Sequence, residues 1–111
     1  MKTEISIFVR SQFVAWHSWQ DAPKEVSYLR NLHRHVFHVT VEKRVEHGNR
    51  DIEFCKFKQN LDEIISSRYM YKELPNVSCE QIADVLMFYM QADRVIVSED
   101  GENGAIVRRI K

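Results

Sequence analysis

Three histidines stand at positions where β-structure would bring them together. His33 and His35 are two residues apart, and residues at that spacing in a strand point to the same face, about 6.7 Å apart in backbone terms. His17 ends the preceding strand-like segment, and directly opposed residues of neighbouring strands have Cβ atoms only about 4.5–5.5 Å apart. The three imidazoles are therefore candidate ligands of one zinc ion, whose bonds to histidine nitrogen are about 2.0–2.1 Å long.

Three histidines without a fourth protein ligand would make an open metal site. Water or substrate completes the tetrahedron of such a site, whereas a structural zinc has four protein ligands. The pattern therefore favours chemistry over scaffolding. An alternative stays open, because an H-x-H pair also occurs by chance: the chain could be a structural domain whose histidines are incidental polar residues.

Two segments with alternating polarity must position these histidines. Apolar side chains recur at every second residue over 5–17 and again over 33–45, and a period of two predicts strands. The connection over 18–32 is long for a hairpin, which predicts a functional or disordered loop. After a turn at Gly48-Asn49, residues 51–54 are expected to end the returning strand.

Two helices are expected next. Apolar residues at helical spacing predict a helix that starts near Cys55; they are Phe54, Phe57, Leu61, Ile64 and Ile65. Ser78 followed by Gln81 is a capping box, in which the hydroxyl and the amide each satisfy an N–H of the first helical turn. It predicts a second helix over 79–90.

The C-terminal part predicts a second hairpin, with strands over 94–99 and 105–110 on either side of a turn rich in Asp, Asn and Gly. The order ββααββ indicates an α+β fold, an antiparallel sheet of two hairpins with two helices on one face. Residues 1–111 are expected to form one domain. Because so short a chain has a small core, assembly into an oligomer would help to bury one face of the sheet.

Composition argues against several classes of protein. Sixteen basic residues balance sixteen acidic ones, so nucleic-acid binding is not expected. The two cysteines, Cys55 and Cys79, are too few for a disulfide framework and are expected to be reduced. No segment has the apolar run of a signal peptide or a membrane helix, and we expect a soluble, cytoplasmic protein.

The sequence resembles the family of 6-pyruvoyl-tetrahydropterin synthase and 6-carboxytetrahydropterin synthase along nearly its whole length. FVAWH (13–17) and NLHRHVFHVTV (31–41) are similar to the family's F-x-A-x-H and H-x-H strands, which supply three zinc ligands. Residues 51–58 resemble its D-F-x-x-L-K entry into the first helix, and residues 78–80 the T-x-E opening of the second. Residues 95–99 resemble the strand that ends in its pterin-binding glutamate.

The resemblance implies the tunnelling fold, in which subunits pack their sheets into a trimeric barrel and two barrels stack as a hexamer. It also implies zinc bound by His17, His33 and His35, and a pterin ring bound by Glu99, with Glu80 as a second substrate-binding candidate. A carboxylate accepts two parallel N–H bonds, which the 2-amino-4-oxo edge of a pterin or guanine offers. The alternatives are an ordinary hairpin-end carboxylate for Glu99 and a favourable helix-dipole charge for Glu80.

The sequence departs from the family where proton transfer takes place. Leu29 stands where the family has an acid–base cysteine, and residues 65–71 lack its Asp-His pair. Arg34 replaces the small residue between the two ligands of the H-x-H pair. Five residues are candidates for the missing proton transfer, and the sequence does not choose among them: Tyr28, His38, Cys55, Arg68 and Cys79. Cys55 is expected at a helix N-terminus, a position that lowers the pKa of a thiol.

Two functions follow from the resemblance. The first is a zinc-dependent lyase acting on dihydroneopterin triphosphate or a related pterin, as in making 6-carboxytetrahydropterin for 7-deazaguanine (queuosine) synthesis. General acid–base groups typically contribute about 10²–10⁴-fold, so such an enzyme would be slow or altered in its chemistry. The second is a zinc-containing protein that binds a pterin or purine without turning it over.

Overall fold

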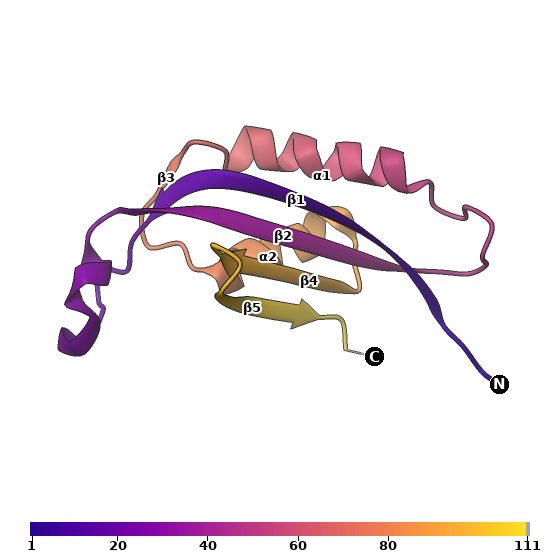
Figure 1. The fold of residues 1–111 in the computed structure, drawn as a ribbon, viewed down its shortest axis with the longest axis horizontal. Coiled ribbons are helices and arrows are strands. Elements are labelled where there is room, and N and C mark those ends of the chain that lie inside the picture. Colours follow the sequence, from indigo (N-terminus) through magenta and orange to yellow (C-terminus); the bar gives the residue numbers. More distant parts are fainter. Residues whose placement is uncertain (111) are drawn as a thin grey trace.

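The computed structural model describes residues 1–110 and has an α+β architecture (Figure 1). In chain order the elements are β1 (Ile5–His17), the 3-10 helix η1 (Lys24–Arg30), β2 (His33–Val45), α1 (Phe54–Arg68), β3 (Glu73–Leu74), α2 (Cys79–Met90), β4 (Arg94–Glu99) and β5 (Asn103–Arg108). The two predicted hairpins and both helices are present, which confirms the α+β class and the ββααββ order of the main elements.

The sheet is built on one long hairpin. β1 and β2 pair antiparallel from Ile5 opposite Val45 to His17 opposite His33. β4 continues the sheet beside β2, β5 lies at its edge, and the strand order is β3-β1-β2-β4-β5. The strands curl as they cross the molecule (Figure 1), whose extents are 51 × 28 × 21 Å.

The sheet is mixed rather than wholly antiparallel. β3 pairs in parallel with the end of β1, Trp16 opposite Glu73 and His17 opposite Leu74. β3 has only two residues, too few to show any periodicity, and the path of the chain between the two helices brings it to that edge. The sequence therefore predicted the larger strands and missed this one.

The strand end expected over 51–54 is wrong. β2 ends at Val45 and α1 begins at Phe54. The carboxylate of Glu53 caps α1 by accepting hydrogen bonds from the backbone N–H groups of Cys55 and Lys56, and these local bonds favour the helix over an extended chain.

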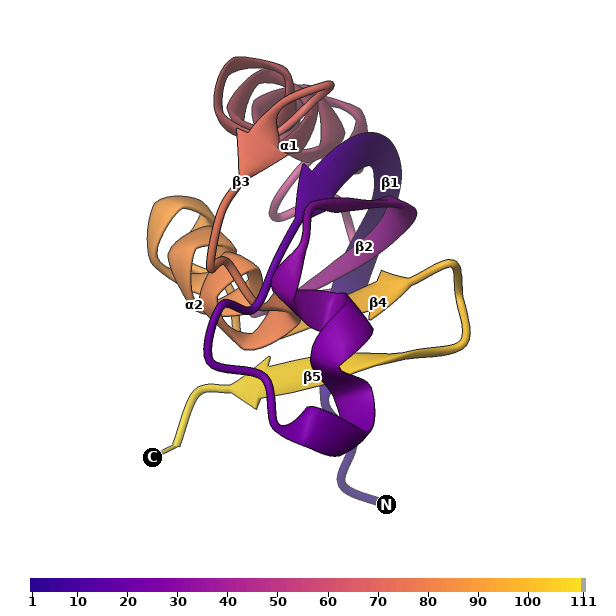
Figure 2. The ribbon, with the colours of Figure 1, turned by 90° about the vertical axis from the view of Figure 1, so that its left-hand side faces the viewer.

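The core lies between the helices and one face of the sheet. Both helices pack on the same face (Figure 2), and odd-numbered strand residues point towards them; Val9, Phe13, Phe37, Val39 and Val41 are buried there against Leu61, Ile65, Ile82 and Leu86. The period-two prediction is confirmed, and so is the capping box, since Ser78 and Gln81 exchange both hydrogen bonds. Within residues 1–110, neither α1 nor α2 lies on the opposite face (Figure 2).

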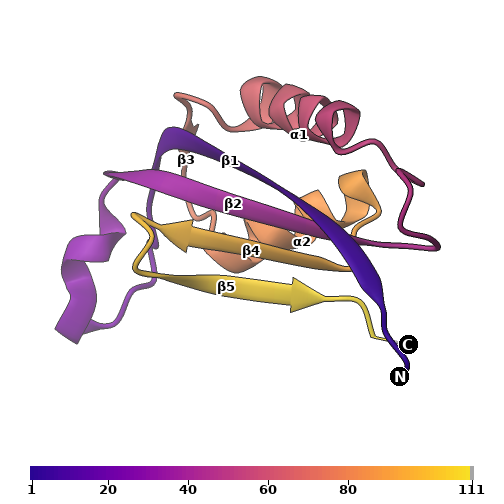
Figure 3. The same ribbon diagram turned by 45° about the vertical axis from the view of Figure 1, so that its right-hand side comes forward.

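One end of the sheet gathers the ends of several elements. The end of β1, the start of β2 and the turn between β4 and β5 all lie there, with η1 beyond them (Figure 3). The last strand begins at Asn103 and ends at Arg108, two residues earlier at each end than predicted. Among residues 1–110, no helix is long and apolar enough to cross a membrane.

Candidate metal centre

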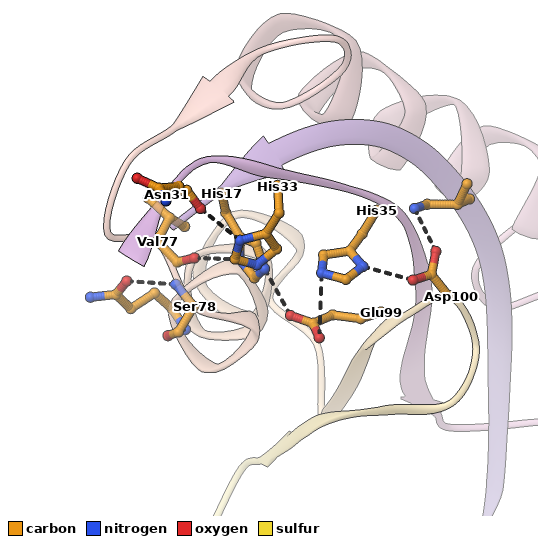
Figure 4. Close-up of polar contacts among 10 residues, drawn as sticks. His17, Asn31, His33, His35, Val77, Ser78, Glu99 and Asp100 are labelled. Carbon is orange, nitrogen blue, oxygen red and sulfur yellow. Dashed lines mark hydrogen bonds and ion pairs between the residues drawn. The ribbon is translucent and has the colours of Figure 1, made fainter. Parts of the chain in front are cut away.

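The three histidines predicted from spacing form one cluster at this end of the sheet (Figure 4). His17 is the last residue of β1 and lies directly opposite His33, the first residue of β2. The ring centroids of His17 and His33 are 4.6 Å apart, those of His33 and His35 are 5.0 Å apart, and those of His17 and His35 are 5.1 Å apart. One ligand nitrogen from each ring lies within 4.8 Å of the other two. The cluster therefore has three nitrogens that could bind one ion.

Each ring is oriented by a partner at its Nδ1 atom. Nδ1 of His17 is 2.8 Å from the carbonyl oxygen of Val77, and Nδ1 of His33 is 2.8 Å from that of Asn31. Nδ1 of His35 is 2.6 Å from Oδ2 of Asp100 (Figure 4). A carbonyl oxygen or an ionised carboxylate only accepts, so we assign the ring protons to Nδ1. The Nε2 lone pairs remain for a ligand, the arrangement usual in metal sites.

The environment of His17 Nε2 fits a metal ion. The atom is buried without a hydrogen-bond partner, although Glu99 Oε2 is only 2.8 Å away. A lone pair and a carboxylate oxygen repel each other at that distance unless a proton or a cation lies between them. Burial lowers the pKa of His17 and outweighs the raising effects of the Val77 carbonyl and of Glu99, while His33 and His35 lower this pKa by smaller amounts. Protonation is therefore disfavoured, while three imidazole nitrogens beside a carboxylate are donors that zinc accepts.

A pocket of about 480 Å³ opens beside the cluster, lined by His17, His33 and Glu99 among others. Its wall includes the apolar side chains of Trp19, Leu29 and Val77 and the carboxylate of Glu80. Small-molecule sites usually enclose roughly 300–1,000 Å³ and combine apolar walls with a few polar groups. The pocket therefore has the size and lining of a site for a small ligand.

The two carboxylates predicted to bind substrate both line this pocket, Glu99 at the end of β4 and Glu80 in the first turn of α2. Glu99 lies against the histidines, with Oε2 2.8 Å from His17 Nε2 and Oε1 3.7 Å from His35 Nε2. Its carboxylate is thus next to the candidate metal position as well as next to the pocket.

The structure brings only one of the five proposed proton-transfer residues into this pocket. Cys79 lines it, but burial, with smaller effects of Glu99 and Glu80, raises the pKa of its thiol to about 12. The other four residues, Tyr28, His38, Cys55 and Arg68, are all exposed and are absent from the described lining. The lowered thiol pKa expected for Cys55 is wrong, because the side chain of Glu53 raises the pKa of that thiol.

Two departures from the family pattern have different consequences. Leu29 lies in the wall of the pocket, so an apolar side chain stands where proton transfer was expected. Arg34 is exposed and pairs with Trp16 between the two ligand positions of β2. Because successive strand residues point to opposite faces, the Arg34 side chain points away from the histidines.

Sequence reasoning missed the groups that orient the rings. Val77 precedes α2 and Asp100 follows β4, and they lie 60 and 65 residues along the chain from the histidines that they contact. Asp100 follows the glutamate singled out at the strand end and precedes Gly101, a turn signal that we used only to place the hairpin.

Solved structures provide the comparison with known proteins. No family model matches the sequence, and no curated protein matches it. The structure is similar to 6-pyruvoyl tetrahydropterin synthase from Caenorhabditis elegans (TM-score 0.77, 13% identity, 97% of each chain covered). It is also similar to the Plasmodium vivax 6-pyruvoyltetrahydropterin synthase, solved as a catalytic-residue variant (TM-score 0.75, 14% identity, 97% of this chain and 99% of that chain).

A third similar structure is an uncharacterized protein from Wolinella succinogenes (TM-score 0.65, 13% identity, 98% of this chain and 100% of that chain). At such low sequence identity, these similarities show a shared fold and nothing about function. The resemblance read from the sequence motifs is thus supported by the three-dimensional structure, and this chain has the fold of the 6-pyruvoyl tetrahydropterin synthases.

Proposed function

We propose that this protein is a zinc-dependent, pterin-synthase-like lyase that acts on dihydroneopterin triphosphate or a related pterin. The observation that carries the proposal is the cluster of His17, His33 and His35, in which one ligand nitrogen of each ring lies within 4.8 Å of the other two and each ring is held through Nδ1. His17 and His33 also line the pocket. The fold shared with 6-pyruvoyl tetrahydropterin synthases supports the class of ligand. A 6-carboxytetrahydropterin-forming reaction that feeds 7-deazaguanine synthesis is the specific activity we expect.

In this proposal His17, His33 and His35 hold the zinc. A bound zinc ion would polarise a hydroxyl or carbonyl oxygen on the side chain of the pterin. Trp19, Leu29 and Val77 would exclude water from one side of the pocket. Glu80, exposed in the first turn of α2, would face the polar part of the ligand.

We assign recognition of the pterin ring to Glu99, whose carboxylate could accept two parallel N–H bonds. In the structure this carboxylate contacts His17 and His35. To bind the pterin ring it must therefore turn away from the histidines and towards the pocket. Replacing Glu99 separates the two possibilities, because loss of a ring anchor weakens pterin binding whereas loss of a metal ligand weakens zinc binding.

A second function is favoured by the wall of the pocket itself. Leu29 cannot transfer a proton, and a thiol pKa of about 12 leaves Cys79 protonated at neutral pH. The protein would then be a non-catalytic zinc-containing protein that binds a pterin or purine. Under this proposal the same histidines and the same glutamate bind the ligand, and turnover is absent.

One experiment separates the two functions. Zinc-loaded protein is incubated with dihydroneopterin triphosphate while acetaldehyde and pterin products are followed by chromatography. Many turnovers per subunit support the lyase, and stoichiometric binding without product supports the binding protein. Elemental analysis of tag-free protein should find about one zinc per chain, and finding none would remove both.

We further propose a homo-oligomer, a trimeric ring or a hexamer of two rings, in a cytoplasmic protein. β5 is an edge strand of the sheet, and an unpaired strand edge can pair with another subunit. Phe8 and Ile106, on the face opposite α1 and α2, are 56% and 51% exposed, and assembly would cover them. Light scattering coupled to size-exclusion chromatography measures the subunit number directly.

A further inference from the structure

Asp100 contacts the histidine cluster at His35, on the side of that ring away from Glu99. It is the first residue after β4, and its Oδ2 lies 2.6 Å from Nδ1 of His35 (Figure 4). On the opposite edge of the same ring, Nε2 lies 3.7 Å from Oε1 of Glu99. His35 thus lies between two carboxylates, one beside the candidate metal position and one on the far side of the ring.

The carboxylate of Asp100 is fixed by the β2 backbone. Its Oδ1 accepts a hydrogen bond from the backbone N–H of Val36 (2.9 Å), and its own backbone N–H donates to the carbonyl oxygen of Val36 (2.7 Å). The residue adopts a left-handed conformation with φ 55° and is followed by Gly101 with φ 74°. Each oxygen therefore has its own partner, so that Oδ2 is held at the ring and is not free to turn away.

This contact decides which nitrogen of His35 can bind a metal. An ionised carboxylate accepts and cannot donate, so the ring proton is held on Nδ1 and the lone pair is left on Nε2. The other two ligand rings are held by the neutral carbonyl oxygens of Val77 and Asn31. His35 alone of the three has a carboxylate as its partner at Nδ1, the carboxylate–histidine pairing that fixes the tautomer and orientation of metal ligands.

The charges around the cluster also favour a divalent cation between the three histidines. Three neutral imidazoles leave the two charges of a divalent ion uncompensated. Glu99 and Asp100, adjacent in sequence and on opposite sides of His35, supply two negative charges close to that position. The two charges of a divalent cation in the cluster would therefore be balanced by these two carboxylates.

We propose that Asp100 is a positioning residue of the metal centre, which holds His35 in the Nδ1–H tautomer and so makes its Nε2 a ligand. The inference rests on the proposed zinc site and adds to it a carboxylate–histidine–metal arrangement contributed by the turn between β4 and β5.

The decisive variant is Asp100→Asn. Asparagine tolerates a left-handed φ at least as well as aspartate, and its amide oxygen can still accept from Val36, so the turn should fold. Its NH₂ group would then face Nδ1 of His35 and donate to it, which favours the tautomer with the proton on Nε2. Glu102→Ala is the matched control, because it removes a carboxylate from the same turn that has no side-chain partner among residues 1–110.

Two measurements test the proposal. Chelator competition should show zinc binding weakened about 10–100-fold in Asp100→Asn, the range typical for loss of an outer-shell partner, and unchanged within about twofold in Glu102→Ala. Nitrogen-15 NMR of the metal-free proteins at alkaline pH should show the Nδ1–H tautomer of His35 in the wild type and the Nε2–H tautomer in Asp100→Asn.

Wild-type zinc affinity and an unchanged tautomer in a folded Asp100→Asn protein would overturn the role of Asp100 while leaving the zinc site intact. Wild-type protein that binds no zinc would instead overturn the proposed metal centre and this role with it. The two failures are therefore distinguishable in one set of titrations.

Discussion

Replacement of His17 by alanine gives the strongest test of the metal centre, because this ring is the most buried of the three, at 7% exposed. The metal-free protein would lose the edge-on packing of the ring against Phe37, with centroids 5.1 Å apart, and the hydrogen bond to the Val77 carbonyl. It would also lose a buried Nε2 atom that has no hydrogen-bond partner. Because these effects oppose each other, we expect the metal-free variant to be destabilised by only about 1–2 kcal/mol.

The larger effect is on the stabilisation that zinc supplies. Free zinc at about a hundred times its Kd stabilises a folded protein by about 2.7 kcal/mol. A chain of 111 residues has an unfolding entropy of roughly 0.23 kcal/mol/K, so the wild-type Tm should rise by about 12 °C. If the variant binds zinc a hundredfold more weakly, the same zinc concentration supplies only about 0.4 kcal/mol, a rise of about 2 °C.

Thermal melts of the two proteins with zinc and with a chelator measure this difference. His38→Ala is the matched control, because His38 lies on the same strand but is exposed and outside the cluster, and it should keep the full rise. A zinc-induced rise in His17→Ala equal to that of the wild type would refute the assignment of His17 as a ligand.

Three further predictions concern neighbouring groups. Glu99→Gln should bind a pterin roughly 10- to 150-fold more weakly, the value of a hydrogen bond to a charged group, while keeping its zinc; calorimetric titration of both ligands checks this, and lost zinc with normal pterin binding would contradict it. The pKa of His17 is lowered from 6.5 chiefly by burial, so the unfolded state binds the proton more readily than the folded state. The metal-free protein should therefore lose stability as the pH falls below about 6.5 towards the lowered pKa. Urea unfolding at several pH values checks this, and the free energy of unfolding should depend less on pH in His17→Ala. Burial raises the pKa of Cys79 from 9.0 to about 12, so its thiolate fraction at neutral pH is roughly a thousandfold lower than normal, and rapid alkylation of this thiol in the folded protein would show the assignment to be wrong.

The sequence alone predicted the four longer strands, both α-helices and the three histidines that the structure brings together. The period of two over 5–17 and 33–45 fixes which side chains share a face, so that His33 and His35 had to be neighbours. The capping box at Ser78 placed the start of α2 at the observed residue. These signals are local. They depend only on which residues follow one another over a short segment, so they can be recognised before the tertiary structure is known.

The tertiary structure decided what surrounds those ligands. β3 has two residues and therefore no periodicity, and its place in the sheet depends on where the chain runs between α1 and α2. The same holds for two of the three groups that orient the rings: Val77 and Asp100 reach His17 and His35 across 60 and 65 residues of chain. These two contacts follow from how the elements pack and leave no pattern in the sequence. Spacing could therefore name the three imidazoles, while only the folded chain shows which nitrogens of His17 and His35 are free to bind.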